Sequence, residues 1–253
     1  MGEAMLVSAG LCFARLVGLL SNMPVFSAQG VPRGVPVLTA LGVTVMLWPA
    51  LTPVMLDGLP RLVLAFGAEL LLGAVMALSL NAVFSAIAMA SELMSMQIGL
   101  GLAIVLDPLQ RSGNGSIGVL ASWLAGLAFL GMGLHRDTLE IVAYSLTVVP
   151  PGSVGLPTDV TPNLIDSVGA CLLLGIQLAG PVLALVWLVN SFVAVLGKLA
   201  PKMNVFFSIG LVLTSVAGIA LLAFSLPWII AAHGGAMAEA VRALEAVIST
   251  VGR

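Results

Sequence analysis

The stretch that organises the chain runs from Met89 to Gly118 and reads MASELMSMQIGLGLAIVLDPLQRSGNGSIG. It begins as a methionine-rich apolar run that carries one acid, Glu92. At Asp107-Pro108 it breaks into a short polar loop, and apolar sequence resumes at Ile117. Nearly everything on either side is hydrophobic enough to lie in lipid. A polar loop between such segments is the first place where we expect function.

The composition sets the class of protein. Of the 253 residues, 60% are hydrophobic and 8% are charged, and the mean hydropathy is +1.18. Soluble domains carry roughly 25% charged residues, so this chain lacks the side chains to cover a water-facing surface. It is an integral membrane protein or a subunit buried in an assembly, and the two are compatible. The net charge of -2 and the lack of a basic block disfavour nucleic-acid binding.

The apolar pattern predicts an all-α fold of membrane-type helical hairpins, some of them long and kinked. About 20 helical residues cross the hydrocarbon core of a bilayer, and the run 62–106 is far longer than that. It is either a hairpin or one long bent helix that extends beyond the membrane. With six membrane segments, four of the basic residues outside them lie on each side of the bilayer, so the positive-inside rule gives no orientation. We divide the single subunit into N-terminal hydrophobic helices (1–106), a loop (107–116), a helix plus loop (117–163), a long helical hairpin with its tip at 198–207 (164–233) and an amphipathic C-terminal tail (234–253).

Three charged residues are expected inside apolar segments. Arg15 lies in the middle of the first segment, and Glu69 and Glu92 lie in the long run. An unpaired arginine at the centre of a bilayer costs about 2.5–3.5 kcal/mol on insertion scales, so Arg15 should face protein or water. Two interpretations of the acids stay open. They line an aqueous path, or one of them forms a structural ion pair with Arg15.

Other motifs carry little chemistry. Met89, Met94 and Met96 either fill gaps in a helical core or form a deformable seal around a pore. Gly113 to Gly118 fits G-x-G-x-x-G, but this pattern indicates dinucleotide binding only between a strand and a helix of a soluble βαβ unit. With two histidines and no metal-ligand spacing, the sequence predicts no enzyme activity, no cofactor and no metal site.

The most specific motif is Ala200-Pro201-Lys202-Met203-Asn204-Val205-Phe206-Phe207, followed by Gly210. It resembles the signature of the FliR family, the flagellar export-gate subunit with relatives in virulence type III secretion. Arg15 followed by Pro24, Glu69 with Gly73, and Glu92 with Gln97, Gly99 and Asp107-Pro108 agree with this resemblance. One departure is Val212-Leu213-Thr214, where the family often has Pro-Leu-Lys, so that a basic group is missing here.

The resemblance implies one copy of this chain in a helical assembly with FliP-type and FliQ-type subunits, largely raised above the bacterial inner membrane at the flagellar basal body. Other large membrane subunits of the export apparatus, membrane lipid and unfolded protein substrates are the further implied partners, with no nucleic acid. The family's loop after the Asp-Pro pair acts as a channel plug and the hairpin tip contacts partner subunits. By position the plug is Asp107, Pro108, Leu109, Gln110, Arg111, Ser112, Gly113, Asn114, Gly115 and Ser116, the gate seal is Met89, Met94 and Met96, and the tip is Pro201, Met203, Asn204, Phe206 and Phe207.

Three alternatives to a flagellar export gate are kept. A secondary transporter would use discontinuous helices and buried acids, but no internal repeat pairs the two halves of this chain. A purely structural assembly scaffold would differ from the gate only in lacking a moving loop. The equivalent subunit of a virulence secretion system would share every feature described above.

Overall fold

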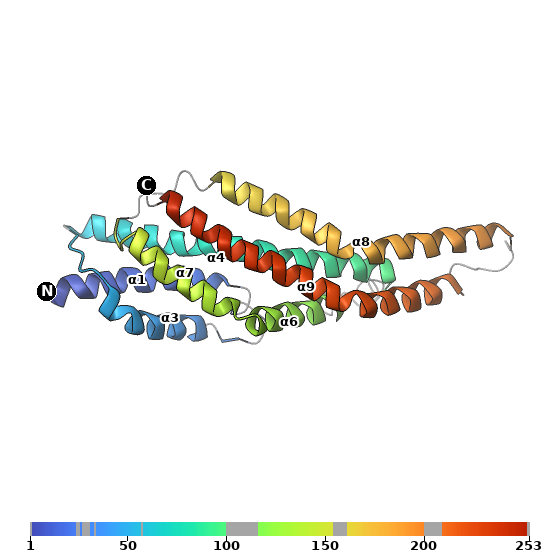
Figure 1. Cartoon of the computed structure of the whole chain (residues 1–253), viewed down its shortest axis with the longest axis horizontal. Coiled ribbons are helices and arrows are strands. Elements are labelled where there is room, and N and C mark those ends of the chain that lie inside the picture. Colours follow the sequence, from blue (N-terminus) through green and yellow to red (C-terminus); the bar gives the residue numbers. More distant parts are fainter. Residues whose placement is uncertain are drawn as a thin grey trace. The chain divides into compact units, whose positions relative to one another are not determined.

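The computed structural model describes residues 2–23, 26, 31–32, 34–56, 58–99, 116–153, 161–199 and 209–251. Within these ranges the chain is helical and contains no strand, which confirms the predicted all-α fold. The elements, shown in Figure 1, are α1 (Gly2–Asn22), α3 (Gly34–Leu47), the short 3-10 helix η1 (Trp48–Ala50), α4 (Leu59–Ile98), α6 (Ser116–Gly131), α7 (Leu134–Val148), α8 (Thr161–Leu199) and α9 (Leu211–Val251).

Four helical segments in the described ranges are long and apolar enough to cross a membrane, and a fifth arises if α6 and α7 form one broken span. The described part of the run 62–106 belongs to one continuous helix of 40 residues, α4 (Leu59–Ile98), rather than to a hairpin. α8 also continues through Pro181, where the sequence predicts a kink or a division. α9 extends over 41 residues and joins the expected last span to the amphipathic tail without a break.

The chain divides into two compact units, and helices α4, α8 and α9 each contribute residues to both. Unit 1 comprises Met1–Val83, Phe129–Gly169 and Ala236–Arg253. Unit 2 comprises Phe84–Ala128 and Ala170–Gly235. Each unit is described separately below.

In unit 1, helices α1 and α4 cross with their backbones in contact. A Cβ atom added to Gly18 would collide with the backbone of Leu70, and one added to Gly73 would collide with the backbone carbonyl of Arg15. Small residues permit this close approach between helices that have no hydrophobic force to drive them together in lipid. The crossing therefore brings together the side chains one turn earlier on each helix, which are Arg15 and Glu69.

The connection between α3 and α4 is held against α1 by a single hydroxyl. α3 ends at Leu47 before Pro49, as the prolines in this segment predict, and residues 51–56 follow without helical structure. The Ser8 hydroxyl donates to the carbonyl of Thr52 and accepts from the N–H of Val54, each at 2.8 Å. These bonds pair backbone groups that would otherwise lack a partner in an apolar environment.

Unit 2 has its own apolar core, built from the second half of α4 together with α6, α8 and α9. A close approach between α4 and α8 also occurs here, because a Cβ on Gly175 would collide with the side chain of Met89. The buried cluster consists of Ile87, Ala90, Met94, Ile98, Ala125, Leu178, Ala179, Val182, Val186 and Ile229.

The glycine crossing predicts a sharp difference between two substitutions on α4. Gly73→Ala forces a methyl group into the α1 backbone, so we expect it to destabilise the protein by about 1–3 kcal/mol, the usual range for overpacking. Gly67→Ala is the matched control, since nothing lies within 4 Å of a Cβ at that position. Thermal unfolding in detergent measures both. Equal melting temperatures for the two variants would contradict the crossing.

Candidate functional site

A buried ion pair joins α1 to α4 in unit 1. Arg15 and Glu69 are both fully buried, and the Nε of Arg15 lies 2.6 Å from an Oε of Glu69. The two terminal nitrogens of Arg15 donate to the hydroxyl of Ser145 at 3.0 Å and to the carbonyl of Val149 at 2.9 Å. The second carboxylate oxygen of Glu69 accepts from the N–H of Gly152 at 2.9 Å. The hydrogen bonds of the two charges thus connect α1 and α4 to the end of α7 and to the turn that follows it.

The partners in this cluster come from the end of α7, where local structure makes them available. The carbonyls of a helix's last turn have no acceptor role inside the helix, so the Val149 carbonyl just beyond α7 is free to bond Arg15. Gly152 has a φ of +80°, a backbone conformation that glycine adopts at little cost. A Cβ there would lie 3.2 Å from a methyl group of Leu11 on α1. The turn therefore fits only a small residue.

Of the two sequence-based interpretations of the acids, the geometry of Arg15 and Glu69 matches a structural ion pair. Removing one partner of such a pair leaves an uncompensated buried charge. Glu92 differs, because it belongs to unit 2, is only half-buried, and forms no ion pair with another described residue. Arg15 is therefore paired with Glu69 and not with Glu92.

The three methionines of the expected seal have unlike environments. Met94 is 2% exposed and belongs to the core of unit 2. Met89 is half-buried, with its terminal methyl against Gly175, whereas Met96 is 60% exposed. Met94 and Met89 fill space inside the unit, as methionine does in irregular cores. The part of the chain that the structure describes gives no test of their role as a seal.

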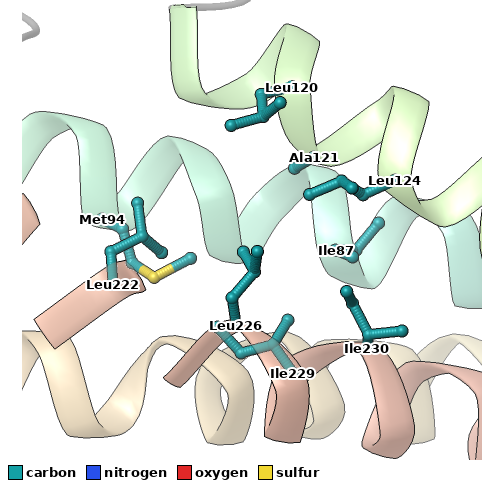
Figure 2. A pocket seen from close by; sticks show the side chains of 9 residues that line it. All are labelled: Ile87, Met94, Leu120, Ala121, Leu124, Leu222, Leu226, Ile229 and Ile230. Atoms are coloured by element: carbon teal, nitrogen blue, oxygen red, sulfur yellow. The ribbon is translucent and has the colours of Figure 1, made fainter. Parts of the chain in front are cut away.

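Met94 also lines a small cavity among α4, α6 and α9. Its volume is about 30 Å³, and Figure 2 shows that its walls are apolar side chains from all three helices. Its lining is wholly apolar and gives a bound water molecule none of the two or more polar partners that it needs. The cavity offers no group that could orient a cofactor. Its lining residues are Ile87, Met94, Leu120, Ala121, Leu124, Leu222, Leu226, Ile229 and Ile230.

Sequence reasoning missed Ser145 and Gly152 of the ion-pair cluster and the buried His233. Ser145 and Gly152 carried no signal, because each lies more than 80 residues from its partner in the ion-pair cluster. His233 is 1% exposed and packs edge-on against Phe84, with ring centroids 5.6 Å apart. Its two ring nitrogens have no hydrogen-bond partner among the described residues. A lone histidine in a long apolar run gave no indication of this.

The expected plug and tip fall mostly outside the described residues. This applies to plug residues 107–115 and to all five tip residues, Pro201, Met203, Asn204, Phe206 and Phe207. Ser116 is the first residue of α6. Among the described residues no cluster of three His, Cys, Asp or Glu side chains could hold a metal ion.

The comparison with protein families decides the affiliation. The model of the family described as bacterial export proteins, family 1, matches residues 6–240. The chain belongs to this family. Its similarity to FliR proteins, inferred above from the motif at residues 200–210, is confirmed over nearly the whole chain.

Proteins that resemble this chain include several named flagellar biosynthetic protein FliR. The relative from Escherichia coli (strain K12) is 27% identical over 221 residues, which cover 85% of this chain and 82% of the relative. The relative from Pectobacterium carotovorum is 28% identical over 225 residues, covering 86% and 83%. The relative from Caulobacter vibrioides is 26% identical and covers 86% and 88%.

The ion-pair cluster predicts that Glu69→Gln strongly destabilises this member of the family. The amide keeps the shape of the side chain but leaves Arg15 as an unpaired buried cation, for which we expect a loss of about 3–5 kcal/mol. Unfolding in detergent measures it. Adding Arg15→Met to Glu69→Gln removes that charge and should recover part of the lost stability.

Glu140→Gln is the control for this prediction. Glu140 also pairs with an arginine, Arg136, at 2.9 Å, but both side chains are largely exposed at 80% and 63%. Exposed pairs of this kind contribute little, so the melting temperature should not change. A Glu69→Gln variant as stable as Glu140→Gln would refute a structural role for the buried pair.

Proposed function

We propose that this chain is a core subunit of the flagellar type III protein export gate. In this proposal it forms, with FliP-type and FliQ-type subunits, a closable channel for unfolded export substrates in the bacterial inner membrane. The observation that carries the proposal is the family match over residues 6–240, together with the flagellar biosynthetic role in the names of the relatives. The physical properties of the helices supply independent support.

The apolar length of α8 supports a place in an assembly. Its segment Val168–Leu199 contains 32 residues, which at a rise of 1.5 Å per residue is about 48 Å, against about 30 Å for the hydrocarbon core of a bilayer. The segment Leu211–Glu245 of α9 contains 35 residues, but its last turns carry Glu239, Arg242 and Glu245. Steep tilting could absorb only part of the excess length of α8. The remaining apolar surface needs a cover of other apolar protein.

The exposure of side chains on these helices also supports a place in an assembly. Only 28% and 17% of the most apolar windows of α8 and α9 are buried within the chain itself. Large aromatic side chains are among the exposed ones, including Trp187 at 65% and Phe224 at 85%. Soluble monomers rarely expose contiguous apolar patches above a few hundred Å². Lipid and neighbouring hydrophobic subunits together account for such surfaces.

Within this assembly the family resemblance assigns roles to the remaining segments. Residues 107–116 act as the channel plug, with the methionines Met89, Met94 and Met96 leading into it as a gate seal. The hairpin tip at 198–207 contacts partner subunits. We propose one copy of this chain per gate.

The proposal predicts that the tagged chain, expressed with its neighbouring genes and purified in mild detergent, is recovered in a complex far heavier than 25.8 kDa. Native mass spectrometry should find one copy of it among several small hydrophobic partners, because its exposed helices need that cover. Recovery as a monomer or homodimer that binds a small solute would instead support a secondary transporter and would end the export-gate proposal.

A second prediction concerns the plug. Deleting Arg111 to Gly115 should make the assembled gate leak small solutes, since the residues that close the channel are removed. Solute permeability is compared in cells that carry the wild-type or the shortened chain. Native mass spectrometry of both gates is the control for intact assembly. Unchanged permeability in a fully assembled variant would rule out the plug and leave the scaffold alternative.

A further inference from the structure

We propose that Ser215 of α9 is a positioning residue that holds the carboxyl end of α4. It thereby fixes the point at which the chain enters the segment leading to the proposed plug. This inference rests on the proposed function, but its structural basis lies wholly in described residues of unit 2.

The contact that carries the inference is a hydrogen bond between two helices. The Ser215 hydroxyl donates to the backbone carbonyl of Ile98 at 2.8 Å. Ile98 is the last residue of α4, and the last four carbonyls of a helix have no partner within that helix. Ser215 therefore supplies from α9, 117 residues away in sequence, a donor that α4 cannot supply for itself.

Packing reinforces this bond on both sides. The Ile98 side chain is fully buried and lies against Gly218, where an added Cβ would come within 2.5 Å of Ile98 Cγ1. Gly99, the residue after α4, has a φ of +90°. A Cβ on Gly99 would lie 3.1 Å from a methyl group of Leu211 and 3.6 Å from the Ser215 hydroxyl. The first turns of α9 thus enclose the end of α4.

α9 is tied to α8 next to the same point. The Thr214 hydroxyl donates to the side-chain oxygen of Asn190 on α8 at 3.1 Å. Thr214 and Ser215 are consecutive, so the end of α4 and the α8–α9 pair meet within two residues of α9. A rotation of α9 that breaks one of these bonds changes the other.

This arrangement explains what Ser215 does for a gate. Gly99 is the last described residue before the stretch that carries residues 107–116, and α9 begins shortly after the hairpin tip. Ser215 is a polar link between the end of α4 and the first turns of α9. Its hydroxyl favours one position of the end of α4, and the loss of that bond shifts the population toward other positions.

The test is Ser215→Ala in the complete gate, read out as permeability to small solutes in cells and as assembly by native mass spectrometry. Loss of one neutral hydrogen bond changes an equilibrium by about fivefold, so we expect roughly fivefold more leak from a gate of unchanged mass. Ser215→Thr keeps the hydroxyl and should leak like the wild type. Leak from Ser215→Thr equal to that from Ser215→Ala would overturn the proposal, as would an assembled Ser215→Ala gate with no leak.

Ser191→Ala is the matched control. The Ser191 hydroxyl makes the same type of bond, at 2.8 Å, but to the Trp187 carbonyl within its own helix, and the residue is exposed. A gate with Ser191→Ala should not leak. A leak as large as that of Ser215→Ala would show that removal of any serine hydroxyl in this hairpin has the same effect, and would overturn the assignment.

Gly99→Ala keeps the proposal testable if Ser215→Ala fails to assemble. A residue with a side chain is strained at this φ, so the substitution disturbs the end of α4 and leaves the Ser215 hydroxyl in place. An assembled, leaking Gly99→Ala gate would support the proposal. The proposal would be overturned, in favour of a purely structural contact, if both variants failed to assemble or if an assembled Gly99→Ala gate did not leak.

The Arg111 to Gly115 deletion separates failure of this inference from failure of the proposed function. If the deletion variant leaks and an assembled Ser215→Ala gate does not, only the role of Ser215 is overturned. An assembled deletion variant that does not leak refutes the assignment of residues 107–116 as the plug.

Discussion

The constraint that governs unit 1 is the burial of one positive and one negative charge among apolar helices. Removing a guanidinium and a carboxylate from water costs several kcal/mol per ion, and mutual attraction offsets this only when further hydrogen bonds are also satisfied. Arg15 uses three nitrogens and Glu69 uses both oxygens. These bonds connect α1 and α4 to the end of α7 and to the turn beyond it. The positions of four chain segments in this unit therefore depend on one ion pair.

The ion pair in turn depends on the contact between two glycines and the opposing backbones. Gly18 and Gly73 let α1 and α4 approach more closely than any residue with a Cβ would allow. Arg15 and Glu69 lie one turn before them. Charge pairing and close packing are thus parts of one arrangement, since the short helix-to-helix distance makes a 2.6 Å contact between the two side chains accessible.

The fold class could be predicted from composition, and Arg15 and Glu69 could be identified as buried charges, because both properties are local in sequence. The choice between Glu69 and Glu92 could not, since it depends on where α1 crosses α4. Ser145 and Val149 lie 130 and 134 residues from Arg15, beyond the reach of any periodicity. Of the kink or division that Pro181 predicts, the division does not occur, since α8 continues through that proline. Thr214, which stands where the sequence departs from the family pattern, donates a hydrogen bond to the side-chain oxygen of Asn190.

The excess length of α8 has a consequence for how the protein would be made. In a bilayer thinner than the segment Val168–Leu199, this helix must tilt or distort the surrounding lipid. In the proposed assembly, the same residues would be solvated first by acyl chains and later by protein. A copy without neighbours would then keep part of an apolar helix exposed, and exposed apolar surface is what chaperones and proteases recognise. The length of one helix would thereby keep the number of surviving copies in step with the supply of neighbouring chains.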